Sequence, residues 1–149
     1  MAWVLVTGED AVLYQNVLRV VRPSGYDVIA APDGAIALQL LVDSAHEMIV
    51  LLRLQMGQMD AADFLATVEA DSSSRLRWRH AYILLHGEPG NLPIEVEQRV
   101  ARLGVWVVAS PGDTTDVEDW ADLLDTLALA ARQLPSSRLS SSGGGPKSS

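Results

Sequence analysis

Short apolar runs alternate with longer segments of helical periodicity along most of the chain. The runs consist mainly of large or β-branched side chains, which is typical of buried strands. In the longer segments apolar residues recur every three or four positions, as they do on one face of an amphipathic helix. The pattern predicts strands over residues 3–6, 26–31, 48–52, 82–85 and 105–109, and helices over residues 11–21, 61–70, 94–103 and 117–134. A further helix follows the turn at 32–34, with Ile36, Leu38, Leu40 and Leu41 on its apolar face.

The run at 48–52, Met-Ile-Val-Leu-Leu, is the strongest strand signal in the sequence. A strand this apolar needs cover on both faces, so we expect it in the middle of a sheet. Regular alternation of strands and helices with short connections indicates right-handed crossovers and a doubly wound parallel α/β sheet with helices on both faces. Ligands in such sheets bind at the carboxyl ends of the strands, so candidate functional residues are sought in the loops there.

Composition narrows the class of protein. The chain has 149 residues, 48% of them hydrophobic, and a net charge of -8. This fits one domain, expected over residues 1–134, followed by a Ser/Gly-rich flexible tail at 135–149. The acidic balance argues against nucleic-acid or anionic-membrane partners, because phosphate binding draws on clustered cations and only Arg75, Arg77 and Arg79 form a basic stretch.

Several kinds of site and location are excluded or disfavoured by what the sequence lacks. It has no cysteine, and therefore no disulfide, thiolate nucleophile or cysteine metal site. No basic segment precedes the first strand, and no apolar run reaches the roughly eighteen residues of a membrane helix, so we expect a cytoplasmic protein.

The loop after the central strand carries a family resemblance. The segment LLRLQMGQMDA at 51–61 resembles the signature of response-regulator receiver domains, where two apolar residues precede the phosphorylated aspartate and a Pro-Gly-Met-Asp-Gly loop follows. The resemblance covers residues 3–134 and implies a flavodoxin-like sheet with the strand order 2-1-3-4-5. The other matching loops are Glu9-Asp10, Pro32-Asp33-Gly34 and Ser110-Pro111, the last where the family has Lys-Pro.

The position of the phosphoacceptor departs from the family. Arg53 stands where the aspartate is expected, and arginine is permanently charged and neither accepts a phosphoryl group nor binds a metal. The acidic pair that holds magnesium in the family aligns with Gly8 and Glu9, with Asp10 next in line. One carboxylate therefore remains where the family has two, and no metal is expected.

Other positions of the site also differ. The hydroxyl residue that ends the fourth strand in the family aligns with His86, and the lysine that ends the fifth strand aligns with Ser110. The switch aromatic of the family aligns with Val107, while Trp106 lies beside it on the opposite face of the strand.

These departures favour a receiver-like signalling module of a two-component or phosphorelay pathway that is not phosphorylated, is not an enzyme, needs no cofactor and acts through protein contacts. Its partner would be a kinase, an output domain or a second copy. Trp106 and Trp120 are candidate interface residues on the fourth helix, fifth strand and fifth helix, because interfaces are enriched in tryptophan. Two alternatives stay open: a receiver regulated by a small ligand in the vacated pocket, and a weak enzyme or nucleotide-binding protein on the same fold.

Two side chains of the site have alternative interpretations. Arg53 would form an ion pair with Glu9 or Asp10 in place of the metal, or would extend its guanidinium to solvent along the pocket wall. His86 is either a pH-sensitive element, with Glu88 nearby, or an ordinary loop histidine.

Overall fold

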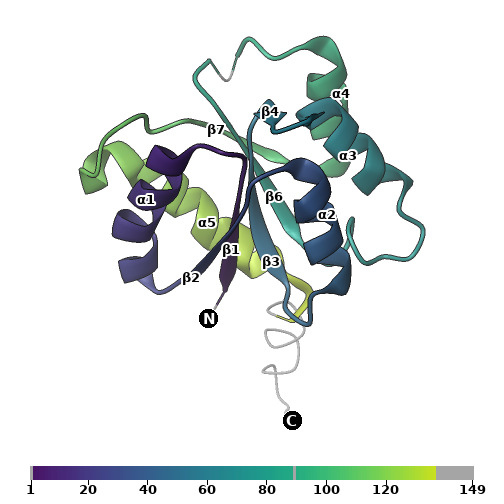
Figure 1. The fold of residues 1–149 in the computed structure, drawn as a ribbon, viewed down its shortest axis with the longest axis horizontal. Coiled ribbons are helices and arrows are strands. Elements are labelled where there is room, and N and C mark those ends of the chain that lie inside the picture. The colour runs from purple at the N-terminus through teal and green to yellow at the C-terminus, as the bar shows by residue number, and fades with distance from the viewer. Residues whose placement is uncertain (1, 89, 137–149) are drawn as a thin grey trace.

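A five-stranded parallel sheet forms the centre of the computed structural model, which describes residues 2–88 and 90–136 (Figure 1). The observed order is β2-β1-β3-β6-β7, which is the predicted order of the five main strands. The strands are β1 (Trp3–Thr7), β2 (Asp27–Ala31), β3 (Met48–Leu52), β6 (Ala81–His86) and β7 (Trp106–Ala109).

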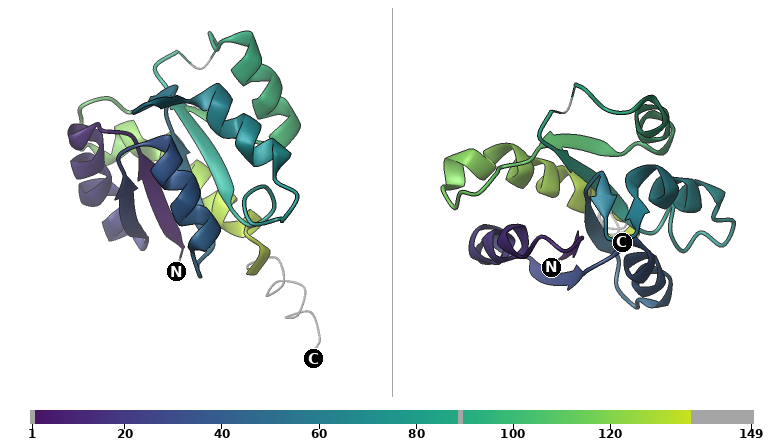
Figure 2. Two further views of the ribbon diagram at one scale, coloured as in Figure 1. Left: turned by 45° about the vertical axis from the view of Figure 1, so that its right-hand side comes forward. Right: turned by 45° about the horizontal axis from the view of Figure 1, so that its top comes forward.

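Helices cover both faces of the sheet, as predicted (Figures 1 and 2). One face packs against α1 (Ala11–Val20) and α5 (Ala121–Gln133), and the other against α2 (Gly34–Asp43), α3 (Ala61–Ala70) and α4 (Ile94–Leu103). Two short 3-10 helices, η1 (Arg22–Ser24) and η2 (Val117–Trp120), complete the connections.

The central strand β3 is buried along its whole length. Its side chains alternate between the two apolar cores, with Ile49 and Leu51 facing α1 and α5, and Val50 and Leu52 facing α2 to α4. Burial on both faces explains why the strand is continuously apolar in sequence.

The segment after β3 differs from the predicted loop. It forms a small antiparallel hairpin of β4 (Gln55–Met56) and β5 (Met59–Asp60). Gly57 lies at the turn with φ +68°, and a Cβ there would come 2.8 Å from the Cβ of Asp33. The hairpin thus packs closely against the start of α2. This contact joins residues distant in sequence, so the local pattern of apolar and polar residues does not predict it.

Two apolar side chains lie elsewhere than predicted. Ile36 is 51% exposed, because the core face of α2 passes through Ala37, Leu38 and Leu41 instead. Trp120 is fully buried against the α1 and α5 side of the sheet, and its indole Nε1 donates to the carbonyl oxygen of Thr114 at 2.8 Å. Trp120 is therefore a core residue and not an interface residue.

The end of the described chain contacts the sheet edge where the strands begin. The Ser136 amide donates to the Glu47 carboxylate oxygens at 3.1 and 3.2 Å. Most of the predicted tail, residues 137–149, lies outside the described residues. Within residues 2–88 and 90–136, no helix is long and apolar enough to span a membrane.

Candidate functional site

The carboxyl ends of β1, β3, β6 and β7 meet at one edge of the sheet, as their parallel registers require. Thr7 ends β1 with its hydroxyl buried and donating to the carbonyl oxygen of Leu51 at 2.7 Å. Gly8 follows with φ +101° and donates its amide to the carbonyl oxygen of Ala31 at 2.9 Å. Because side-chain-bearing residues rarely adopt this conformation, a carboxylate at position 8 would be strained.

Arg53 and Asp10 form an ion pair across this edge. Arg53 Nη1 lies 3.1 Å from Asp10 Oδ2, and the two side chains are 31% and 44% exposed. Of the two carboxylates considered in the sequence, the structure pairs Arg53 with Asp10. The guanidinium thus sits beside the end of the central strand with a defined partner.

The Asp10 carboxylate also caps the N-terminus of α1, with Oδ1 accepting from the Leu13 amide at 3.0 Å. This backbone hydrogen bond is the main reason that the pKa of Asp10 is lowered, and Arg53 lowers that pKa further. Each carboxylate oxygen therefore accepts one hydrogen bond from a donor within the chain.

A hollow of about 200 Å³ opens next to the ion pair. Of the residues named from the sequence, it brings together Asp10, Arg53 and Ser110. The sequence did not single out the other residues that line it, which are Val12, Leu13, Gly112 and Asp113. Asp113 accepts from Asn16 Nδ2 at 3.4 Å, and its place three residues after Ser110 in the loop following β7 is the sequence signal that could have indicated it.

The remaining candidates do not line this hollow. Gly8 shapes the backbone, and Glu9 is exposed. His86 ends β6 half-buried, and its carbonyl oxygen accepts from the Ser110 amide at 3.1 Å. Within residues 2–88 and 90–136, no three His, Asp or Glu side chains gather as metal ligands would.

Val107 and the neighbouring Trp106 face opposite sides of the sheet, as the alternation of side chains along a strand predicts. Val107 packs into the core beneath α3 and α4, and Trp106 packs half-buried into the core beneath α1 and α5.

Solved structures with the same architecture include chemotaxis and response-regulator proteins. Vibrio cholerae CheY4 matches with a TM-score of 0.66 and 22% identity, over 87% of this chain and 98% of that one. A receiver domain of Methanospirillum hungatei matches with a TM-score of 0.67 and 18% identity, over 89% and 96%. The chain has the receiver-domain fold.

A third similar structure is that of a response regulator with a bound ligand. Thermotoga maritima TrrA, in complex with Mg²⁺ and BeF, matches with a TM-score of 0.64 and 14% identity, over 87% of this chain and 99% of that one. No protein-family model and no curated protein sequence matches the chain. The receiver fold is thus shared at identities that support the architecture alone.

The partly exposed ion pair predicts small and unequal effects on stability. Arg53→Ala is expected to lower the free energy of unfolding by about 0.5–1 kcal/mol, because a solvent-accessible pair contributes little. Asp10→Ala is expected to cost about 1–2 kcal/mol, since it also removes the cap of α1. Urea denaturation followed by circular dichroism measures both, and equal losses would contradict this division of roles.

Proposed function

We propose that this chain is a signalling module with the receiver fold that acts through protein contacts and does not accept a phosphoryl group. The observation that carries the proposal is the Arg53 side chain, which extends from the end of the central strand and pairs with Asp10 at 3.1 Å. A guanidinium has no lone pair to offer a phosphoryl group and stays protonated at cellular pH.

The surroundings of Arg53 support the same conclusion. Magnesium usually needs carboxylate oxygens together with phosphate oxygens. Both oxygens of Asp10 already accept hydrogen bonds, one from Arg53 and one from Leu13. The cation of Arg53 thus takes the electrostatic place of a metal and holds the β1–α1 and β3–β4 loops in one arrangement.

Without phosphoryl transfer, protein contacts are the first candidate route for a signal. We place the partner in a two-component or phosphorelay pathway of the cytoplasm: a kinase, an output domain or a second copy. A homodimer through α4, β7 and α5 would use the half-buried Trp106 and the 65% exposed Ile94, while Trp120 has no part in it.

A small ligand is the second candidate, favoured by the hollow beside Arg53. Its volume, about 200 Å³, is below the roughly 300–1,000 Å³ usual for ligand pockets. Its lining also holds two carboxylates, Asp10 and Asp113, against the one guanidinium of Arg53, so the hollow admits only a small molecule and does not favour an anion. Regulation through protein contacts therefore ranks first.

Treatment with acetyl phosphate and Mg²⁺ tests the proposal. We expect the intact mass of the wild-type chain to stay unchanged, because no carboxylate stands at position 53. A receiver domain that carries the acceptor aspartate, treated in parallel, should gain the mass of one phosphoryl group. The same gain in this chain, mapped to any side chain of the site, would overturn the proposal.

An Arg53→Asp variant tests whether an aspartate at position 53 is enough for the chain to accept a phosphoryl group. We expect it to remain unmodified, because Gly8 supplies no carboxylate and Ser110 supplies no cation for the phosphoryl oxygens. Mass spectrometry after the same treatment gives the answer. A modified variant would mean that Arg53 alone blocks the reaction.

A further inference from the structure

The loop between α3 and β6 carries a solvent-exposed tryptophan, Trp78. Trp78 is 60% exposed, whereas Trp120 is buried and the other two tryptophans of the chain are half-buried. The Arg77 guanidinium carbon lies 4.8 Å from the centre of the Trp78 ring, in cation–π contact. An exposed aromatic with a cation stacked on it is a frequent anchor of protein interfaces.

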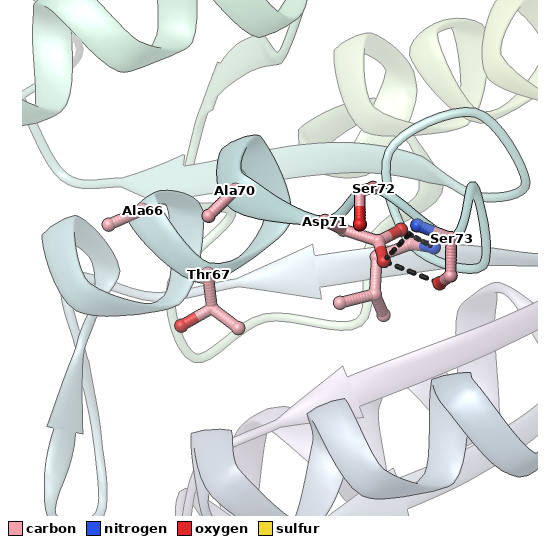
Figure 3. A pocket seen from close by; sticks show the side chains of 7 residues that line it. Ala66, Thr67, Ala70, Asp71, Ser72 and Ser73 are labelled. Atoms are coloured by element: carbon pink, nitrogen blue, oxygen red, sulfur yellow. Dashed lines mark hydrogen bonds between the residues drawn. The ribbon is translucent and has the colours of Figure 1, made fainter.

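Hydrogen bonds fix the conformation of the loop that carries Trp78. The Asp71 carboxylate accepts from the amide and hydroxyl of Ser73 and, at 2.8 Å, from the amide of Leu76 (Figure 3). Leu76 is 4% exposed, and the buried Tyr82 hydroxyl donates to its carbonyl oxygen at 2.8 Å. A preorganised loop loses little conformational entropy when a partner binds.

Cations gather beside this loop. Arg99 Nη1 and Arg102 Nε of α4 lie 2.5 and 2.6 Å from the carboxylate of Glu69 on α3. The Arg102 hydrogen bond is the main cause that lowers the pKa of Glu69, and Arg99 and Arg77 add smaller electrostatic contributions. Two guanidinium groups therefore pair with one carboxylate, and Arg77 acts on it electrostatically, which leaves a local excess of positive charge in a chain whose net charge is -8.

We propose that this arginine–tryptophan surface, defined as Arg75, Arg77, Trp78, Arg99 and Arg102, binds an acidic segment of a protein partner. The excess cations match two or three carboxylates, and the Trp78 ring offers an apolar contact between them. An open hollow of about 540 Å³ adjoins the same loop, and Ala66, Ala70 and Leu76 are among its lining residues (Figure 3). The hollow gives room for one apolar side chain of that segment.

The charge distribution favours a peptide over a longer polyanion. A nucleic acid or an anionic membrane extends beyond so small a patch and would meet the acidic remainder of the chain. A short acidic segment meets the arginines alone. This inference rests on the proposed function in that it names a partner chemistry for a module that works through protein contacts.

Fluorescence anisotropy of a labelled peptide tests the proposal, using the full chain and a peptide of Asp and Glu with one central Leu. We expect saturable binding that weakens with added salt, and about tenfold weaker binding for Trp78→Ala and for the double variant Arg75→Ala/Arg77→Ala. The matched control is Arg19→Ala/Arg22→Ala, which removes the same charge from exposed positions on α1 and η1. It should bind within about twofold of wild type if the contact is local.

Three results would overturn the proposal: no binding of the peptide, equal weakening by the two double variants, or tighter binding to a single-stranded oligonucleotide or to phosphatidylserine vesicles. Circular dichroism of each variant separates lost binding from lost folding. Phosphoryl transfer to the chain would defeat the proposed function and leave the peptide result in place, so the two failures are distinguishable.

Discussion

Replacing Trp120 with alanine is expected to lower the free energy of unfolding by about 3–5 kcal/mol, the usual cost of removing a large aromatic side chain from a packed core. Trp120 is fully buried among residues of α5 and the sheet, and its indole Nε1 donates to the Thr114 carbonyl oxygen at 2.8 Å. The substitution leaves a cavity and an unpaired carbonyl group. Urea denaturation monitored by circular dichroism measures the loss.

Trp106→Ala is the matched control, because Trp106 is half-buried in the same core. It removes the same side chain and should cost clearly less, since less of the ring leaves water on folding. An alanine at position 120 that left the free energy of unfolding within about 1 kcal/mol of wild type would contradict the core assignment. If Trp120→Ala changed self-association but not the free energy of unfolding, Trp120 would be an interface residue after all.

Lowering the pH from 6.5 to about 4 is expected to destabilise the fold through His80. His80 is 6% exposed, its Nδ1 accepts from the Met48 amide at 3.0 Å, and its Nε2 lies 3.1 Å from the Leu41 carbonyl oxygen. Because Nδ1 accepts a hydrogen bond, the proton of the neutral ring is on Nε2, which donates to Leu41. The neutral ring thereby joins the end of α2 to the start of β3.

Burial is the main reason that the pKa of His80 falls from 6.5 to about 4; nearby Arg79 lowers it further, while the Leu41 carbonyl and Glu47 oppose the shift. The unfolded chain therefore binds the proton more readily than the folded one. The stability from neutral His80 is fully present above pH 6.5 and is lost as the pH falls to about 4. The expected loss over this window is about 3 kcal/mol.

His80→Ala should remove this pH dependence and, at neutral pH, lower the free energy of unfolding by about 3 kcal/mol, because it leaves the Met48 amide and the Leu41 carbonyl unpaired. Thermal denaturation across the pH range measures both effects. His46→Ala is the control: it removes an exposed histidine stacked on Trp3 and should cost much less. If His80→Ala lost stability as steeply as wild type between pH 6.5 and 4, the pH effect would belong to other groups.

The repeating elements were readable from local pattern because each depends on neighbours in sequence. The predicted bounds of β3, α3 and α4 agree with the structure, and the last helix was predicted as one unit where the structure has η2 followed by α5. The hairpin of β4 and β5 was missed, since its turn at Gly57 is fixed by contact with Asp33, which is distant in sequence. Ile36 was misplaced because a helix of nearly uniform apolarity does not mark which side meets the core.

That position 53 carries a permanent cation and no carboxylate is determined by the sequence alone, since the chemistry of arginine does not depend on its surroundings. The partner of that arginine was decided only by tertiary structure. Glu9 and Asp10 are adjacent in the chain, and either could pair with Arg53 by sequence. Asp10 forms the ion pair because capping α1 fixes its carboxylate beside Arg53. Burial separated the tryptophans in the same way: Trp120 packs against the sheet in the core, whereas Trp78 is 60% exposed on a loop in which Asp71 and Tyr82 hydrogen-bond to Leu76.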